Sequence, residues 1–477
     1  MDHISGLPDE VLCHILSFLP TKLAALTSVL STKWRNLLAF VPNLDITCPI
    51  KIVPVDSIDY GIPKENMYGT MRSFRGFIDR VLALQGDSSI KKVSLKCINY
   101  IHPDHLDRWI CNVLRRGVSE LETVIYDQDG DDDFNYLLPQ EMFVSRTLVK
   151  LIFSNVDWWP GAEGTFLPKL KTLVVNGFFC SDKLEMILPA FPVLEELYIK
   201  DIVWRGSGDS VSSASLKKLT IHALGCESMT VHITNSMSIS FDTPSLLYLE
   251  YSDKVASDYP KVNLPILVEA VIDLDIRDYT MLDRERNADG FRNYVVLSCG
   301  NLCKLMTGIR NVKTLTFSCE TLELFSLCFE SMPVFNNLKR LRISGSRPPV
   351  GWQAMPVLLQ NCPHLETLHI ECLRICDCIS LEENGGWLTS CPVEKIVEEI
   401  QIEMFRGTKG EIGMIKHMLE SFSGLKRMTL YAGRDYPTDI FDLVVKMVNL
   451  CNESYRAVVN TSWCVIRPIS EVDSSLK

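Results

Sequence analysis

Acidic side chains that could bind a divalent cation gather in the stretch DQDGDDDF, residues 127–134. Carboxylates at alternate positions are the ligands that Ca²⁺ takes in an EF-hand loop, but that loop also needs glycine at its sixth position and glutamate at its twelfth. Here the glycine is the fourth residue, and Leu138 stands at the twelfth position. The sequence therefore predicts a solvated acidic loop and no metal site.

Thiol and imidazole groups that could bind zinc lie close together near residue 370. They are Cys362, His364, Cys372, Cys376 and Cys378. Structural zinc sites usually contain a C-x-x-C pair, and this group has none. We therefore expect buried free thiols, no bound metal and no cofactor.

Serine and histidine residues that could take part in nucleophilic catalysis lack the required context. The triplet GDS at residues 86–88 and at 208–210 is similar to the serine motif of lipases, yet neither copy lies in a strand–turn–helix setting with catalytic partners. The stretch HPDH at 102–105 is expected to form a surface loop. No phosphate-binding glycine-rich motif is present. The sequence therefore predicts a protein without catalytic activity of its own.

The bulk properties are those of an ordered globular protein. Of 477 residues, 47% are hydrophobic and 22% are charged, and the net charge is −11. This acidic total argues against a nucleic-acid interface, which needs a basic face. The N-terminus lacks the regions of a secretory signal, and no uncharged apolar run reaches the roughly 18 residues that span a bilayer. With 17 irregularly spaced cysteines, we expect reduced thiols, a cytoplasmic or nuclear location and no membrane contact.

The first forty residues predict a small apolar helical module. In LPDEVLCHILSFLP, residues 7–20, Pro8 suits the first helical position, and the two acids after it suit the helix dipole. Two more helices are predicted around Leu23–Ser28 and Thr32–Ala39. Three helices this short cannot bury all their apolar side chains among themselves. The module is therefore either a docking surface or the N-terminal cap of the next domain.

This module resembles the plant F-box over roughly residues 4–44. The residues in register with that motif are Leu7-Pro8, Ile15-Leu16, Leu19-Pro20, Val29-Leu30-Ser31 and Trp34-Arg35. The resemblance implies docking onto a Skp-type adaptor and, through it, onto the cullin and RING subunits of a ubiquitin ligase. The residues implied in the adaptor contact are Leu7, Pro8, Leu12, Ile15, Leu16, Leu19, Val29, Leu30 and Trp34. The departures from the motif, at Leu23, Thr32 and Leu38, remove none of these apolar anchors.

From about residue 90 the chain repeats the pattern L-x-x-L-x-[ILVF]. The units begin at Ile90, Leu121, Leu148, Leu170, Leu194, Leu216, Leu246, Leu267, Val312, Leu338, Leu365, Val397 and Leu425. Their spacing is 21 to 32 residues, apart from one gap of 45 after Leu267. This period is typical of leucine-rich repeats, in which the last two apolar positions lie on one buried side of a short strand. We therefore expect an irregular solenoid, or horseshoe, whose core forms between stacked neighbours.

The residue between those two apolar positions is expected to face the concave surface of the horseshoe. The candidates for binding a target protein are Ile125, Ile152, Val174, Tyr198, Arg342 and His369. This surface is expected to be apolar in its first half and polar in its second. The alternative is that long inserts cover it, or that it packs against the preceding segment.

The C-terminal part predicts a strand, a helix over Glu411–Phe422 and a second strand. It resembles the FBD module, which closes many plant F-box proteins with leucine-rich repeats, at Phe405-Arg406-Gly407, Glu411 and Met418-Leu419. The predicted fold class is α/β: a three-helix F-box, an irregular leucine-rich-repeat solenoid and a C-terminal FBD-type cap. The expected ranges are 1–48 for the F-box, 49–89 for a linker, 90–380 for the repeats, 385–435 for the FBD-type module and 436–477 for a C-terminal segment.

The resemblance implies a substrate-recognition subunit of an SCF-type ubiquitin ligase. Such a subunit holds an unidentified target protein near a ubiquitin-conjugating enzyme and raises the effective concentration of the target's lysines. Two alternatives stay open. One is a repeat scaffold that acts without ubiquitin transfer. The other is a small-molecule receptor, similar to plant hormone receptors of this architecture, with Lys150, Lys218, Arg340 and Arg427 as the basic residues for an anionic ligand.

Overall fold

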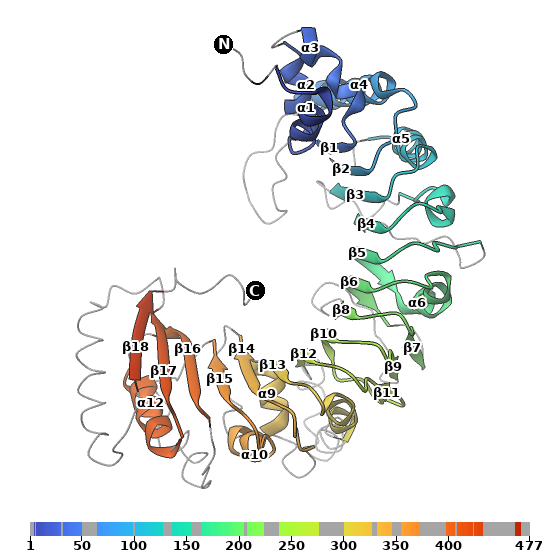
Figure 1. The fold of residues 1–477 in the computed structure, drawn as a ribbon. Helices are drawn as coiled ribbons and strands as arrows, with labels where there is room; N and C mark the ends of the chain where they lie inside the picture. Colours follow the sequence, from blue (N-terminus) through green and yellow to red (C-terminus); the bar gives the residue numbers. More distant parts are fainter. Residues whose placement is uncertain are drawn as a thin grey trace. The chain divides into compact units, whose positions relative to one another are not determined.

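The protein consists of parallel strands and helices, the α/β class predicted from its sequence. The structure, a computed structural model, describes residues 4, 6–29, 32–49, 64–98, 101–126, 136–154, 164–204, 208–223, 238–275, 300–326, 332–345, 354–371, 397–405, 408–422, 424–432 and 463–468. The chain forms two compact units, residues 1–230 and 231–477. In each unit, helices and turns lie along one face of a row of strands (Figure 1), and we call the opposite face the open face.

The N-terminal helices are shorter and more numerous than the three predicted. They are α1 (Asp9–Leu16), α2 (Thr21–Leu26), the 3₁₀-helix η1 (Thr27–Val29), α3 (Thr32–Arg35) and the 3₁₀-helix η2 (Leu37–Phe40). The helix predicted over Thr32–Ala39 is divided at Asn36. An asparagine side chain competes for backbone hydrogen bonds and favours turns over helix interiors, which explains the break.

The first unit is built on seven described strands that pair in parallel in chain order. They are β1 (Asn43–Thr47), β2 (Lys92–Ile98), β3 (Glu120–Tyr126), β4 (Lys150–Ser154), β5 (Thr172–Cys180), β6 (Glu196–Val203) and β8 (Lys218–Ala223), with β7 (Asp209–Ser212) apart from them. The elements alongside are α4 (Lys64–Gln85), α5 (Pro103–Arg115), η3 (Gln140–Val144), α6 (Ser181–Ile187) and η4 (Leu188–Ala190). The register forms one row of Asp45, Ser94, Glu122, Ile152, Val174, Tyr198 and Thr220.

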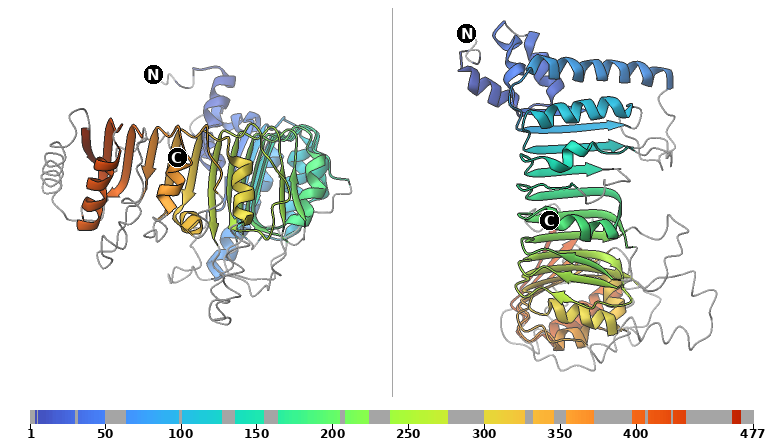
Figure 2. Two further views of the ribbon diagram at one scale, coloured as in Figure 1. Left: turned by 90° about the horizontal axis from the view of Figure 1, so that it is seen from below. Right: turned by 90° about the vertical axis from the view of Figure 1, so that its right-hand side faces the viewer.

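The N-terminal helices are continuous with the first strand rather than a separate module. The hydroxyl of Thr21 in α2 accepts a 2.8 Å hydrogen bond from the backbone N–H of Asp45 in β1. Gln85, at the end of α4, donates to the carbonyl oxygens of Leu38 at 3.3 Å and Val41 at 3.0 Å. Figure 2 shows α4 as the long blue helix of the right-hand view. These bonds fix the inner side of the helices against the start of the solenoid.

The second unit repeats the same arrangement. Its described strands are the short pair β9 (Ile239–Asp242) and β11 (Val262–Asn263), and then β10 (Tyr248–Lys254), β12 (Glu269–Asp275), β13 (Thr314–Ser318), β14 (Arg340–Ser344), β15 (Thr367–Ile370), β16 (Glu399–Phe405), β17 (Arg427–Ala432) and β18 (Trp463–Pro468). Its helices include residues 300–309, α9 (Cys319–Ser326), α10 (Met355–Gln360) and α12 (Lys409–Ser421). The corresponding row is Glu250, Val271, Thr316, Arg342, His369, Gln401 and Thr429.

The gap of 45 residues in the repeat pattern is an insertion between two neighbouring strands. β12 pairs directly with β13, with Ala270 opposite Leu315. The described part of the inserted sequence contains the helix at residues 300–309. The helix packs closely, since a Cβ at Gly308 would lie 2.1 Å from Cγ1 of Val262. The sheet therefore continues across the insertion without a further strand.

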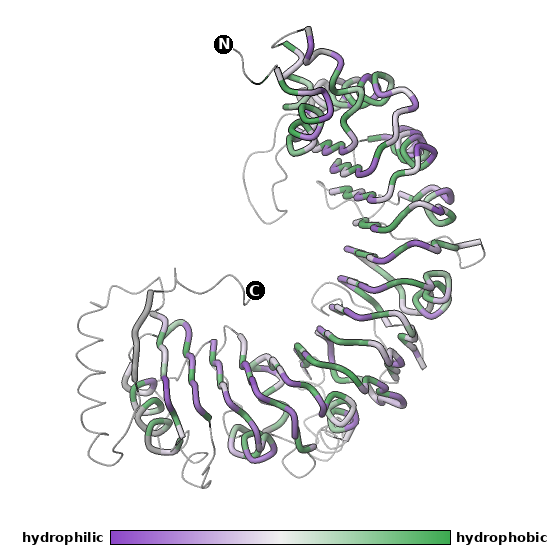
Figure 3. Tube along the Cα trace, in the orientation of Figure 1, coloured by the Kyte–Doolittle hydropathy of each residue, from purple (hydrophilic) through white to green (hydrophobic). Residues whose placement is uncertain are grey.

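The core lies between the strands and the helices, where the repeated apolar positions meet. In β8, Leu219 and Ile221 are fully buried, and in β10 the same holds for Leu249 and Tyr251. Figure 3 shows the resulting alternation of hydrophobic and hydrophilic residues along the strands. Full burial of one such side chain contributes about 1.5–3 kcal/mol. Each repeat gains this only when its neighbours cover it.

The repeat predicted to begin at Leu121 begins three residues earlier. β3 pairs with β2 so that Leu121 lies opposite Val93, which makes Val118 the first apolar position of this unit. Val118 is fully buried, and so is Thr123 at the third apolar position. Because threonine stands there in place of an aliphatic residue, the pattern matches better three residues further along, and the predicted register was wrong.

The C-terminal prediction of strand, helix and strand is confirmed by β16, α12 and β17. The helix begins at Lys409, two residues before the predicted start. Thr408 caps it: its hydroxyl accepts from the backbone N–H of Glu411 at 3.3 Å, and its backbone N–H donates to the Glu411 carboxylate at 3.1 Å. β16 pairs with both β15 and β17, so this segment extends the sheet of the second unit. Arg406 and Gly407 lie outside the described residues.

The HPDH stretch is the start of α5 rather than a surface loop. Pro103 occupies the first turn, where a missing N–H costs nothing, and Nδ1 of His102 accepts from the backbone N–H of Asp104 at 3.4 Å. His105 therefore lies in the first turn of a helix.

The other chemical groups singled out in the sequence give no site in the described part of the chain. No group of three or more His, Cys, Asp or Glu side chains there is placed to bind a metal ion. The acidic stretch 127–134 and the cysteines at 372, 376 and 378 lie outside the described residues. Among the described helices, none is both long and apolar enough to cross a bilayer.

Two leucines that differ in burial, one in β10 and one just before it, provide a test of where the core lies. Leu249 is fully buried in β10, whereas Leu247, just before it, is 42% exposed. We expect Leu249→Ala to lower the free energy of unfolding by about 2–5 kcal/mol through loss of burial and cavity formation. Leu247→Ala should change it by less than about 1 kcal/mol. Urea unfolding followed by circular dichroism measures both, and equal losses would contradict the burial of Leu249 and the exposure of Leu247.

Candidate functional site

The described N-terminal helices leave a group of large apolar side chains exposed to solvent. We call this group the N-terminal apolar surface, and its members are Ile4, Val11, Ile15, Phe18, Leu23, Leu26, Val29 and Phe40. Val29 is 81% exposed and Phe18 is 74% exposed. Exposed apolar area is costly in water, at about 25 cal/mol per Å², so a gathering of such residues on one small module marks a docking surface.

The residues predicted to contact an adaptor divide between this surface and the interior. The exposed or half-exposed members are Leu7, Pro8, Ile15, Leu19 and Val29. The buried members are Leu12, Leu16 and Trp34, and Leu30 lies outside the described residues. The apolar positions of α1 cover more than one face of the helix, and the inner set packs inside the module. In the chain by itself these three side chains pack inside the module, and their contact with an adaptor stays a prediction.

Six of the eight members of this surface were absent from the predicted contact set: Ile4, Val11, Phe18, Leu23, Leu26 and Phe40. Phe18 follows the end of α1, and its ring lies edge-on to His14 with ring centres 4.9 Å apart. In α2 the buried positions are the small residues Thr21 and Ala24, so Leu23 and Leu26 face solvent. The exposure of the two leucines could have been predicted from the stretch TKLAAL, residues 21–26. Its buried positions are the small residues threonine and alanine.

A lysine on α3 links the edge of this surface to the start of α1. Nζ of Lys33 donates to the carbonyl oxygen of Leu7 at 2.6 Å and lies 3.4 Å from the carboxylate of Asp9. Its ammonium group therefore joins α3 to the segment just before α1. This contact therefore helps to fix the position of Leu7 relative to α3.

The open face of the first unit has a half-buried apolar centre. Ile152, Val174 and Tyr198 lie side by side in its row, as predicted. The predicted neighbour Ile125 is instead buried and lies opposite Cys97, because the register of β3 differs from the predicted one. Glu122 takes its place.

Polar groups flank this apolar centre on both sides. Glu122 forms an ion pair of 3.1 Å with Lys96 on the neighbouring strand. At the other end, the ring of Tyr198 contacts His222 edge-on, with ring centres 5.8 Å apart. The face therefore combines apolar area with charged and aromatic groups, a composition suited to a protein partner.

The open face of the second unit is polar, and its charges form a linked group. Arg342 lies 3.8 Å from Glu371 and 3.9 Å from Glu403, and Nε2 of His369 lies 2.8 Å from the Glu403 carboxylate. The histidine approach is close enough for an ion pair but lacks hydrogen-bond alignment. His369 is buried and Arg342 is half-buried. These side chains therefore link β14, β15 and β16 and make this face polar.

The cysteine pKa values that shift in the described residues all shift upward. Burial raises the pKa of Cys13, and the charges of Asp9 and Glu10 raise it further. Burial also raises the pKa of Cys303, and it raises that of Cys111 to about 11 with help from Glu141. A catalytic cysteine needs the opposite shift, because the thiolate is the nucleophile. The shifts therefore favour the protonated thiol at all three positions.

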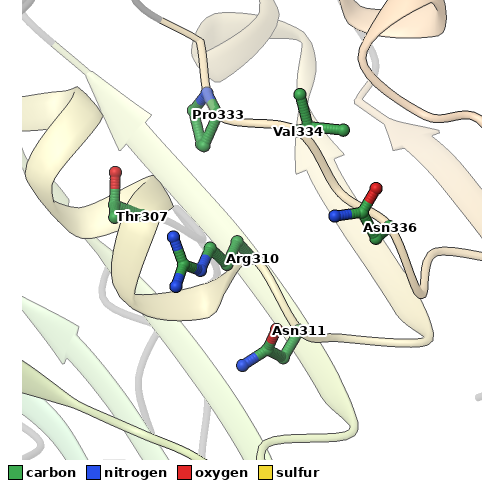
Figure 4. A pocket seen from close by; sticks show the side chains of 6 residues that line it. All are labelled: Thr307, Arg310, Asn311, Pro333, Val334 and Asn336. Carbon is green, nitrogen blue, oxygen red and sulfur yellow. The ribbon is translucent and has the colours of Figure 1, made fainter.

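A cavity of 490 Å³ opens beside the helix at residues 300–309 (Figure 4). Its lining residues are Thr307, Arg310, Asn311, Pro333, Val334 and Asn336. It lies at the turns that precede β13 and β14, away from the row on the open face. The basic residues suggested for an anionic hormone, at positions 150, 218, 340 and 427, do not line it. The small-molecule alternative therefore gains no support from this cavity.

Comparisons with known proteins match the same parts of the chain. The F-box domain model matches residues 4–44, and the model for the leucine-rich repeats of the FBD-associated F-box protein At5g56370 matches residues 106–343. Three Arabidopsis thaliana proteins are similar over nearly the whole chain. F-box/LRR-repeat protein At3g58930 is 49% identical, covering 95% of this chain and 96% of its own length. F-box protein At3g03040 is 48% identical (99% and 100%), and F-box protein At3g59000 is 46% identical (96% and 93%).

The raised pKa of Cys111 gives a measurable pH dependence. With a pKa of about 11, its thiol is almost fully protonated near neutral pH, so the thiolate fraction should rise about tenfold per unit between about pH 8 and 10. Alkylation of the folded chain by iodoacetamide, followed by mass spectrometry of the Cys111 peptide, should show this slope. An exposed cysteine in a short peptide is the control, and it levels off above about pH 9. A plateau at the same pH for Cys111 would contradict the shift.

Proposed function

This chain belongs to the family of F-box/leucine-rich-repeat proteins, and on that premise we propose that it is the substrate-recognition subunit of an SCF-type ubiquitin ligase. Its partners are a Skp-type adaptor and, through the adaptor, the cullin and RING subunits. The observation that carries the proposal is the N-terminal apolar surface, all of whose members lie within residues 4–44. This is the part of the chain that matches the F-box model.

The exposure of this surface favours a docking role over that of a simple solenoid cap. A terminal cap buries its inner side against the next repeat and needs a polar outer side for solubility. Here the inner side is already occupied, through Thr21, Gln85 and the carbonyl groups of η2. The outer side nevertheless presents Phe18 and Val29 to solvent. A second protein that covers these side chains would remove the free-energy cost of exposing apolar area to water.

The open face of each unit, taken by itself, is a proposed site for a target protein. Ile152, Val174 and Tyr198 offer apolar and aromatic area on the first unit, and Arg342 with its carboxylate partners offers polar contacts on the second. Once held there, the target is near a ubiquitin-conjugating enzyme bound to the partner subunits. Catalysis then comes from those partners, and this chain contributes proximity. In this function the protein works in the cytoplasm or the nucleus.

The adaptor contact is tested by changing only exposed residues. We expect the double variant Phe18→Asp, Val29→Asp to lose capture of a purified Skp-type adaptor in a pull-down, because two charges would be buried without partners in the complex. The control is Leu84→Asp on α4, which is 47% exposed and lies outside residues 4–44. It should bind the adaptor as the wild type does.

Circular dichroism and the melting temperature of the two variants should match the wild type, because both changed positions face solvent. Adaptor capture by a folded double variant at the wild-type level would show that the N-terminal apolar surface is not the docking site. Failure of the wild type itself to capture an adaptor would remove the basis of the ligase assignment.

A further inference from the structure

The outer helices of the first unit bring two arginines, a histidine and an aspartate together, apart from the surfaces discussed above. Arg75 and Asp79 belong to α4, and His105 and Arg108 belong to α5. Nη1 of Arg75 lies 3.2 Å from Nε2 of His105, and Nη2 of Arg108 lies 3.1 Å from Nδ1 of the same ring. The imidazole is thus placed between two guanidinium groups.

The two contacts of this imidazole with arginine cannot both be hydrogen bonds. A neutral histidine has one donor nitrogen and one acceptor nitrogen, whereas a guanidinium only donates. Only one of the two arginines can therefore donate to His105, and the other faces an N–H group. Protonation would make both contacts unfavourable. Burial lowers the pKa of His105, and the charges of Arg75 and Arg108 lower it further.

The carboxylate of the cluster does not compensate both arginines. Oδ1 of Asp79 accepts from Arg108 at 2.8 Å and from the indole N–H of Trp109 at 2.8 Å. Over the ranges that the structure describes, Arg75 forms no ion pair with a carboxylate. Arg72 lies one turn earlier on the same side of α4, where residues three apart are neighbours. Two or three positive charges therefore share one negative charge.

Two other acidic side chains of α5, Asp104 and Asp107, have partners of their own. Asp104 lies 3.4 Å from Nδ1 of His102 at the start of α5 and is mostly exposed. Asp107 accepts a 2.7 Å hydrogen bond from the hydroxyl of Tyr136. The local excess of positive charge stands out in a chain whose net charge is −11.

We propose that Arg75, His105 and Arg108 form a binding site for a phosphate group, either free phosphate or a phosphate monoester. A tetrahedral oxyanion beside the ring, within reach of both arginines, would give each guanidinium a further acceptor and would offset the two donors that face each other. Arginine suits this role because its planar fork donates two parallel hydrogen bonds to an oxyanion. Phosphate fits better than a carboxylate, because three groups from two helices converge and phosphate offers more acceptor oxygens. The site goes beyond the proposed function and does not depend on it.

Bound phosphate would also change the titration of the histidine. With the two positive charges offset by an anion, the charged form of His105 is no longer opposed, so the pKa of His105 rises. This change is specific to an anion at the cluster. A purely structural role for the two arginines would leave the pKa of His105 independent of phosphate.

The test is a titration of the full-length chain with inorganic phosphate and, separately, with O-phosphoserine. Histidine ring resonances are followed by NMR, and the loss of one set of signals in His105→Gln identifies those of His105. Chloride at equal ionic strength is the reference anion. We expect phosphate to raise the pKa of His105 and Arg75→Gln or Arg108→Gln to weaken phosphate binding roughly tenfold or more.

The matched control is Arg80→Gln, since Arg80 is exposed on α4 but points about 140° away from Arg75 around the helix. It should bind phosphate as the wild type does. Binding of inorganic phosphate alone would identify free phosphate as the ligand, and tighter binding of O-phosphoserine would identify a phosphorylated side chain. Equal pKa values for His105 in phosphate and chloride, or equal affinities for all the arginine variants and the wild type, would overturn the proposal.

Discussion

A repeat of two dozen residues can bury its apolar side chains only against the next repeat, and every other feature of the structure depends on this constraint. The backbone meets it by pairing parallel strands in one continuous register within each unit, so that equivalent residues form rows. The buried rows are aliphatic, as at Leu219 and Leu249. The row on the open face lies outside the core between strands and helices, so it varies from Ile152 to Arg342 and can carry specificity.

The N-terminal helices obey the same constraint with a different outcome. Their inner side contacts the first strand through Thr21 and contacts α4 through Gln85. They are therefore the first layer of the solenoid and not a separate module. Nothing within the described part of the chain covers their outer side at Phe18 and Val29. One short module thus ends the solenoid on one side and presents an apolar surface for a partner on the other.

Charge is distributed in two contrasting ways. At the turns before the strands, exposed ion pairs run between neighbouring repeats, as in Lys171–Glu195 at 3.1 Å and Glu195–Lys217 at 3.2 Å. Such pairs are mutually compensated, and each contributes little to stability because water screens it. Around His105 the compensation is incomplete, with two guanidinium groups directed at one ring. An uncompensated site of this kind suits recognition of an external anion better than stabilisation of the fold.

The sequence by itself determined the family, the α/β class and the repeat pattern, because the spacing of apolar residues follows from strand periodicity and from the need to stack. It also indicated a docking surface in the first forty residues. Only the tertiary structure decided which apolar residues of α1 face inward, because Leu12 and Ile15 differ in burial but not in chemistry. It likewise moved the start of the second repeat from Leu121 to Val118, since the pairing partner of a strand, not its own pattern, sets its register. The contact of His105 with Arg75 joins residues thirty positions apart, and no local pattern encodes such a contact.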